Sequence, residues 1–107
     1  MVTYKVTIDD QAKESISCIH AYLKNNASKT VADKVVEGIL QTIDSLATMP
    51  ERNTIVEEIS TDKVVYHRIL KWSYKIIYRI MEEDLEVIVV EVFHERQDPS
   101  RVFKLIE

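Results

Sequence analysis

Side chains that can transfer a proton or hold an anion gather between residues 67 and 96 of this chain. His67 and His94 carry imidazole rings that titrate near neutral pH, so either could act as a general acid or base. Arg68, Lys75 and Arg96 are positively charged, and the guanidinium fork of arginine matches a phosphate or a carboxylate. For Arg68 and Arg96, a structural ion pair is an equal alternative to a functional contact.

The same stretch holds residues suited to contact another protein. Trp72 falls in a predicted turn, where an exposed indole would indicate a partner. Tyr74 and Tyr78 alternate with isoleucines along a predicted strand, and this pattern favours burial of both rings in the core. The candidate partner-binding residues are Arg68, Trp72, Arg79 and Arg96.

No motif in the chain indicates a metal or a cofactor. The histidines, His20, His67 and His94, show no zinc-binding spacing, and the chain's single glycine rules out a glycine-rich phosphate loop. Cys18 is the only cysteine, so an internal disulfide cannot form and a reducing compartment is expected. We therefore expect neither a metal nor a cofactor.

Composition predicts one folded domain that spans residues 1–107. Hydrophobic residues make up 46% of the chain and charged residues 30%, as in soluble globular proteins. No apolar run has membrane-spanning length, and the N-terminus reads as the start of a strand rather than as a signal peptide. We expect a cytoplasmic protein without a membrane partner.

The distribution of charge is more informative than its sum. A net charge of −4 and a pI of about 5.4 argue against a nucleic-acid binder. From Lys63 to Met81, however, basic residues occur without a single acid. A basic sheet on an acidic body could meet an anionic partner, although an ordinary solvated strand face would give the same pattern.

The first half of the chain predicts a strand and a helical hairpin. Residues 2–8 alternate between apolar and polar, which is typical of a half-buried strand. Asp9 or Asp10 can cap a first helix, and Ser28 or Thr30 a second helix that ends at Met49-Pro50. The second helix carries the clearest apolar stripe, with Gly38 inside it as a close-approach site for the first helix or as a tolerated accident. The stripe consists of Ala32, Val35, Val36, Ile39, Leu40, Ile43, Leu46 and Ala47.

The second half predicts an antiparallel meander. Its strands are Val64–Leu70, Tyr74–Met81 and Leu85–His94, joined by turns too short for a parallel return. Leu85–His94 is apolar on both faces, as a central strand tends to be. Residues 55–59 form a weak strand candidate, and residues 100–107 a tail of one or two helical turns. The predicted fold is α+β, a twisted antiparallel sheet with the helical hairpin on one face and a less covered opposite face.

Together these elements resemble the RelE/ParE superfamily of bacterial toxins, over about Tyr4 to Phe103. The resemblance implies the toxin of a type II toxin–antitoxin system, a small cytoplasmic protein neutralised by a tightly bound antitoxin. Such antitoxins resemble disordered segments that fold when they bind. The motifs that carry the resemblance are Leu46-x-x-x-Pro50, Tyr66-His67-Arg68, the run from Tyr74 to Ile80 and the run from Val92 to Pro99.

Two activities occur in this superfamily, and only one is enzymatic. RelE-like members cut mRNA inside the ribosome. ParE-like members poison DNA gyrase and share a His-x-Arg after the last strand, which His94 and Arg96 resemble. If this chain were RelE-like, the catalytic residues implied by the resemblance would be His94, Arg68, Arg96, Lys75 and His67.

The chain departs from the RelE pattern in two places. The position that resembles the RelE tyrosine is Phe103, which has no hydroxyl, and Tyr66, His67 and Arg68 stand where RelE has paired lysines. The acidic pI also suits a ribosomal phosphate surface poorly. We therefore predict a ParE-like inhibitor of gyrase, with a RelE-like nuclease or a non-toxic degenerate binding module as alternatives. A homodimer stays open.

Overall fold

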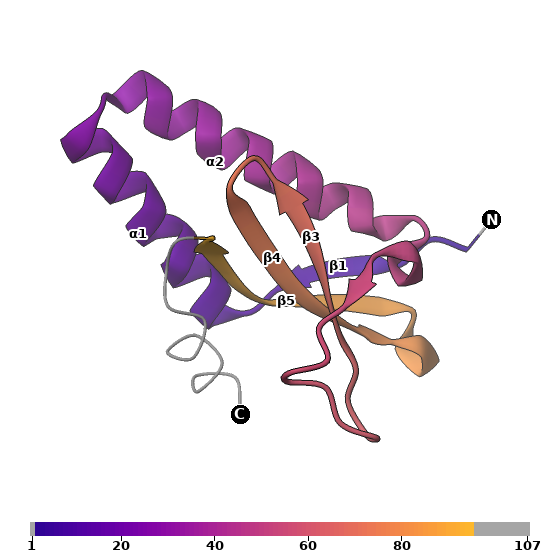
Figure 1. Cartoon of the computed structure of the whole chain (residues 1–107). Coiled ribbons are helices and arrows are strands. Elements are labelled where there is room, and N and C mark those ends of the chain that lie inside the picture. Colours follow the sequence, from indigo (N-terminus) through magenta and orange to yellow (C-terminus); the bar gives the residue numbers. More distant parts are fainter. Residues whose placement is uncertain (1, 96–107) are drawn as a thin grey trace.

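The computed structural model describes residues 2–95, which form a five-stranded sheet with two helices packed on one face (Figure 1). The predicted tail, residues 100–107, lies outside the described residues, as do Arg96 and Phe103. In chain order the elements are β1 (Lys5–Ile8), α1 (Asp10–Asn26), α2 (Lys29–Asp44), β2 (Thr54–Ile55), β3 (Tyr66–Lys71), β4 (Tyr74–Met81) and β5 (Glu86–His94), with 3₁₀ turns at Ser45–Ala47, Pro50–Arg52 and Glu82–Asp84.

The sheet has the strand order β1-β5-β4-β3-β2. The predicted meander is confirmed, because β3, β4 and β5 are consecutive antiparallel neighbours. The sequence did not predict how the N-terminal strand joins this sheet: β1 lies at one edge, parallel to β5. A parallel neighbour needs a long connection between its strands, and the helical hairpin together with the meander supplies it. The sheet is therefore mixed.

Both helices begin at the predicted caps. The Asp9 carboxylate accepts the backbone N–H of Asp10, and the Ser28 hydroxyl accepts that of Val31. The prediction that the second helix ends at Met49-Pro50 is wrong, because α2 ends at Asp44 and only a 3₁₀ turn, Ser45–Ala47, follows it. Met49 takes a φ of 49° directly before Pro50. In the described part of the chain, no helix combines the length and the hydropathy needed to cross a membrane.

The apolar stripe of α2 packs against the sheet along most of its length. Ile39, Ile43 and Leu46 are almost fully buried there. Leu40 is an exception to the predicted stripe, because 38% of its surface is exposed. It follows Ile39 by 100° around the helix, and this rotation turns it away from the sheet.

The weak strand predicted at residues 55–59 is shorter than expected. Only Thr54 and Ile55 pair with β3, opposite Arg68 and His67. The chain then leaves the sheet edge, and Val56 and Ile59 pack on the face opposite the helices. The structure thus has a small second core in addition to the large one under the helices.

A β-bulge divides β5, which lies between β1 and β4. Ile77 pairs with Glu91, but the next residue, Tyr78, pairs with Val89, so Val90 has no counterpart on β4. Val89 packs in the helix-covered core, whereas Val90 packs in the second core on the opposite face. The prediction that this strand is covered on both sides is confirmed.

Gly38 allows a close approach, but by the β3–β4 turn rather than by the first helix. A Cβ atom at this position would lie 2.6 Å from Cζ3 of Trp72 and would overlap the neighbouring ring carbon as well. Trp72 itself has a φ of 53° in the turn that joins β3 to β4. The indole therefore rests on the bare backbone of α2 at Gly38.

The buried stripe of α2 predicts a large loss of stability on truncation. Ile39→Ala or Ile43→Ala should lower the free energy of unfolding by about 2–5 kcal/mol, through lost transfer energy and a residual cavity. Leu40→Ala, the matched control on the same helix, should cost clearly less. Chemical denaturation monitored by circular dichroism measures all three. An unchanged midpoint for Ile39→Ala and Ile43→Ala would contradict the assigned core.

The contact between Gly38 and Trp72 predicts an effect that depends on the indole. Alanine is worth about 1 kcal/mol more than glycine inside a helix. In a Trp72→Ala background, Gly38→Ala should show this gain, whereas with Trp72 present displacement of the ring should remove much of it. Trp72 is the only tryptophan, so its fluorescence should shift to the red in Gly38→Ala. Equal gains in both backgrounds would refute the contact.

Candidate functional site

The residues predicted to transfer protons or to bind anions are divided between the two faces of the sheet. Directly opposite residues on neighbouring strands share a face, and successive residues on one strand alternate. His67 is paired with Tyr78, and both point toward the helices. Arg68 is paired with Ile77, and both point to the opposite face. We call this second side, which carries Arg68, Lys75, Arg79, Ile88 and Val90, the open face.

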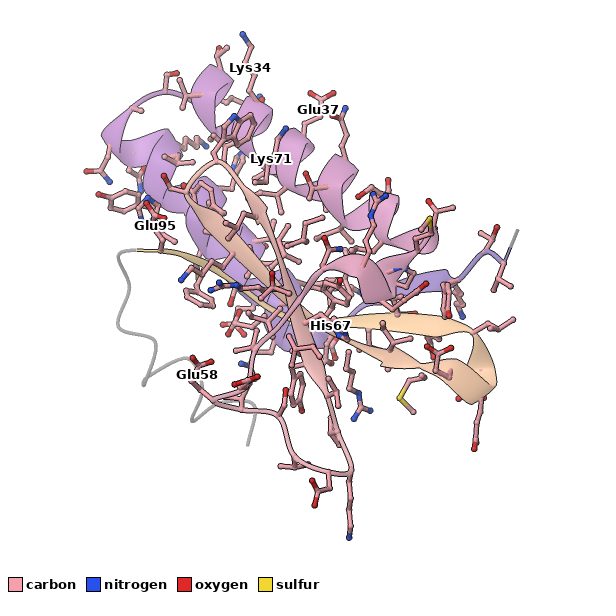
Figure 2. All side chains as sticks on the ribbon, turned by 45° about the vertical axis from the view of Figure 1, so that its right-hand side comes forward. Lys34, Glu37, Glu58, His67, Lys71 and Glu95 are labelled. Carbon is pink, nitrogen blue, oxygen red and sulfur yellow. The ribbon has the colours of Figure 1, made fainter. Side chains whose placement is uncertain are left out.

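His67 is enclosed in the interior of the protein (Figure 2). Only 7% of its surface is exposed, and its ring stacks on Tyr78 with centroids 5.5 Å apart. Its buried Nδ1 atom has no hydrogen-bond partner among residues 2–95. Burial lowers the pKa of His67, although the carboxylate of Glu51 opposes part of that effect. A neutral, stacked and unpartnered imidazole acts as a packing residue.

Tyr78 anchors the segment that connects α2 to the sheet. Its hydroxyl donates a hydrogen bond of 2.6 Å to the carbonyl of Pro50 and accepts one of 2.9 Å from the Asn53 amide. Burial raises the pKa of Tyr78 to about 12, so the ring stays neutral. The prediction that this tyrosine belongs to the core is confirmed.

His94 lies at the other end of the helix-covered face. It ends β5 opposite Tyr74, and the two rings meet edge to face with centroids 5.2 Å apart. Tyr74 is half-buried, and burial raises its pKa. Because Tyr74 and Tyr78 are four residues apart on β4, the two histidines are separated by roughly 14 Å along the strand. The sheet does not bring them together.

Three cations share the open face. Arg68 lies opposite Ile77, between Lys75 and Arg79 on the neighbouring strand. Diagonal neighbours of this kind have Cα atoms about 7–8 Å apart. All three side chains are half-buried, and the ion pairs found within residues 2–95 lie on the helical hairpin and engage none of them. Arg96, which was predicted to join this set, lies outside the described residues.

A groove crosses the open face beside these cations. It encloses about 480 Å³ and follows one line of paired residues across four strands. The half-buried Arg79 lies at the centre of that line. The lining residues are Thr7, Asp9, Gln11, Tyr66, Arg79, Ile88 and Val90.

Trp72 is exposed at the tip of the β3–β4 hairpin, as predicted. Its side chain keeps 60% of its surface open, and the Lys71 ammonium lies 4.6 Å from the ring centroid. One end of the indole is held against Gly38. The indole is therefore positioned in advance for a contact, while its role in partner binding stays a prediction.

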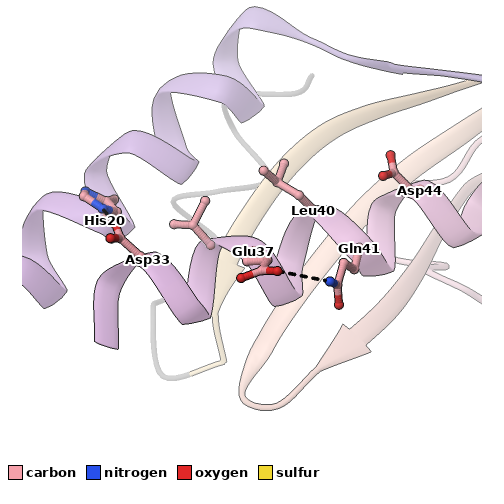
Figure 3. A pocket seen from close by; sticks show the side chains of 7 residues that line it. His20, Asp33, Glu37, Leu40, Gln41 and Asp44 are labelled. Carbon is pink, nitrogen blue, oxygen red and sulfur yellow. Dashed lines mark hydrogen bonds and ion pairs between the residues drawn. The ribbon is translucent and has the colours of Figure 1, made fainter. Parts of the chain in front are cut away.

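A second hollow lies on the outer side of the helical hairpin (Figure 3). It encloses about 400 Å³. Nε2 of His20 on α1 lies 2.7 Å from Oδ1 of Asp33 on α2, and this hydrogen bond is the main cause that lowers the pKa of Asp33. The surroundings are acidic, through Asp33, Glu37 and Asp44. No sequence pattern pointed to this pair, because its members are 13 positions apart and lie on different helices.

Glu91 is a buried acid that sequence reasoning did not single out. It is 3% exposed, and its carboxylate accepts hydrogen bonds of 2.9 Å from the Gln11 amide and from the backbone N–H of Val92. Its place as the one acid inside the apolar run of β5 was the available signal. In residues 2–95, no group of three or more histidine, cysteine or acidic side chains is placed to hold a metal ion.

The chain is similar to one known protein family in sequence and to several solved structures in fold. Residues 6–99 match the family described as the ParE toxin of type II toxin–antitoxin systems, parDE. A chromosomal ParDE system from P. aeruginosa superposes with a TM-score of 0.69 at 12% identity, covering 88% of this chain and 98% of that one. An archaeal RelE–RelB complex from Pyrococcus horikoshii gives a TM-score of 0.59 at 17% identity, covering 90% and 99%. The two structures share the predicted α+β fold.

One curated protein also shows similarity in sequence. DNA primase DnaG of Aeropyrum pernix is 29% identical over 112 residues, which cover 91% of this chain. This chain spans about a quarter of that protein's length, 26%. The similarity therefore concerns one part of a much longer protein.

The burial of His67 predicts a loss of stability in mild acid. Because the folded-state pKa lies below the unfolded value of about 6.5, the unfolded chain binds the proton first, and stability should fall as the pH drops below about 6.5. The slope contributed by one such group is at most about 1.4 kcal/mol per pH unit. His67→Phe, which preserves a stacked ring, should remove this contribution. Denaturation curves between pH 7.5 and 5 measure it, and parallel curves for both proteins would refute the assignment.

Proposed function

This chain belongs to the family of ParE toxins of type II toxin–antitoxin systems, and on that basis we propose that it arrests bacterial growth by inhibiting DNA gyrase. In this proposal, residues 1–107 form one toxin domain that works in the cytoplasm, where its target lies. A cognate antitoxin neutralises it by binding. The structure from P. horikoshii is described as a RelE–RelB complex, and we extend the same kind of partnership to this chain.

The observation that carries the choice of gyrase is the division of chemical groups between the two faces. Cleavage of RNA needs a proton-transfer group beside cations that stabilise the phosphate. Here His67 and His94 belong to the helix-covered side, while Arg68 and Lys75 belong to the open face. Of the five residues that a RelE-like activity implies, the four that lie within residues 2–95 are thus split between the two faces of the sheet. An inhibitor that acts by contact needs no such set.

The burial of His67 gives further support to an inhibitor that acts by contact. The Nδ1 atom of His67 is closed off from solvent, and its ring is committed to a stack on Tyr78. A substrate could reach that imidazole only after the core had opened. The groups that remain accessible are cations and an aromatic ring, which are the residue types that dominate protein–protein contacts. We therefore propose Arg68, Trp72, Arg79 and Arg96 as contacts to protein partners.

Toxicity and its relief provide the first test. Controlled expression in a bacterial host should arrest growth, and co-expression of the protein encoded by the adjacent gene should restore growth. A variant with the destabilising change Ile39→Ala serves as the folding control and should be less toxic in proportion to its lower soluble level. Normal growth at a confirmed soluble level of the unchanged protein would leave the non-toxic binding module as the better description.

Two assays with purified protein distinguish the two activities. We expect inhibition of supercoiling by gyrase in vitro and intact mRNA on translating ribosomes. His94→Gln should retain toxicity, because in this proposal no proton passes through that ring. If ribosome-bound mRNA is cut, and His94→Gln abolishes the cuts while the fold is preserved by circular dichroism, the protein is a RelE-like nuclease instead.

A further inference from the structure

We propose that the groove across the open face binds an extended segment of the antitoxin, with a carboxylate of that segment paired to Arg79 and an adjacent apolar side chain seated on Ile88 and Val90. The inference rests on the proposed function insofar as the partner is an antitoxin. It adds where one part of that partner binds and what chemistry that part must have.

The groove follows from strand pairing rather than from loop conformation. Thr7 on β1 lies opposite Ile88 on β5, Ile88 lies opposite Arg79 on β4, and Arg79 lies opposite Tyr66 on β3. The four side chains form a line across the sheet on its open face. The bulge adds Val90 to the same face, so the floor has two apolar side chains in a row. A floor built on a hydrogen-bonded sheet needs little rearrangement when a ligand binds.

Arg79 is the cation in this groove, and it has no ion-pair partner among residues 2–95. Its side chain is half-buried among Tyr66, Ile88 and Val90. Carboxylates near the groove already accept hydrogen bonds: Glu86 from Thr7, and Glu91 from Gln11 and the Val92 amide. Asp9, at the β1 end of the groove, accepts the backbone N–H of Asp10. A half-buried guanidinium beside apolar side chains is well placed to take a carboxylate through two parallel hydrogen bonds.

The same surroundings favour a peptide over a nucleic acid. Asp9 lines the groove on the side of β1, and Glu86 and Glu91 lie on the adjoining strand β5. A nucleic acid carries a negative charge on every nucleotide, so its phosphates would be repelled by these acids as well as attracted by Arg79. A peptide can place one acid at Arg79 and an uncharged or basic residue near Asp9. Charge complementarity therefore favours a peptide segment that carries one carboxylate, placed where the groove crosses β3 and β4.

The test measures affinity for the protein encoded beside the toxin gene, by titration calorimetry of the purified toxin. Arg79→Glu should weaken binding about 100-fold or more, and Arg79→Leu, which keeps apolar contact with the groove, about tenfold or more. Arg79→Lys keeps the charge but loses the bidentate geometry, so its loss should be smaller than that of Arg79→Leu. Ile88→Lys, which places a cation on the half-buried part of the apolar floor, should also weaken binding.

Lys34→Glu provides the matched control. It makes the same change of two charge units on the exposed side of α2, where Lys34 points away from the body of the molecule (Figure 2). Its affinity should stay within about threefold of the unchanged toxin. Circular dichroism and the emission of Trp72 confirm that each variant is folded. Should Arg79→Glu not fold, Arg79→Leu and Arg79→Lys carry the comparison.

A charge reversal locates the partner's side of the contact. Replacing the acids of the antitoxin one at a time with lysine should reveal one substitution that weakens binding to the unchanged toxin and restores binding to Arg79→Glu. Unchanged affinity of all Arg79 variants would overturn the groove while leaving the toxin assignment intact. Failure of the unchanged toxin to bind this protein would overturn both. Arg79-dependent binding of a 12-nucleotide RNA, with antitoxin affinity unaffected, would also overturn the peptide assignment.

Discussion

The strand β5 is stable only if both of its faces are covered, because apolar side chains lie on both of them. Different segments of the chain cover the two faces. The helical hairpin covers Val87, Val89 and Val92, while residues after β2 cover Val90 and Phe93. The two neighbouring strands then satisfy the backbone of β5, one parallel and one antiparallel. Because β5 pairs with β1 on one side and β4 on the other, it fixes where these strands lie, and through β4 also the position of the cations on the open face.

This dependence explains which parts of the fold could be predicted from the sequence. The meander and the hairpin were predictable because their signals are local: short turns between β-branched runs, and an apolar stripe behind Ser28. The parallel pairing of β1 was not, since its partner lies some 80 residues later and no local pattern encodes it. The exposure of Leu40 and the contact of Gly38 with Trp72 depend on how far α2 is rotated and how close it approaches β3, and these are set by tertiary packing.

For the candidate site, proximity in sequence was a poor guide to proximity in space. His67 and Arg68 are adjacent in the chain, yet the pleat directs one into the core and the other to the open face. Their opposite directions follow from the two-residue period of a strand alone. What the sequence could not supply was the difference in burial: His67 is stacked on Tyr78 and only 7% exposed, whereas Arg68 stays half-buried without an ion pair in the described residues. Burial therefore separates a structural histidine from accessible cations.

The bulge in β5 connects packing to the proposed contact surface. In a regular strand, Val90 would face opposite to Glu91, so only one of them could lie on the open face. The extra residue turns both toward that side, after which Val92 returns to the helix-covered core. Val90 then extends the apolar floor begun by Ile88, and Glu91 becomes accessible to the Gln11 amide, which ties the start of α1 to the sheet. The carboxylate that would otherwise compete for Arg79 is thereby engaged by α1, and the guanidinium remains available to a partner.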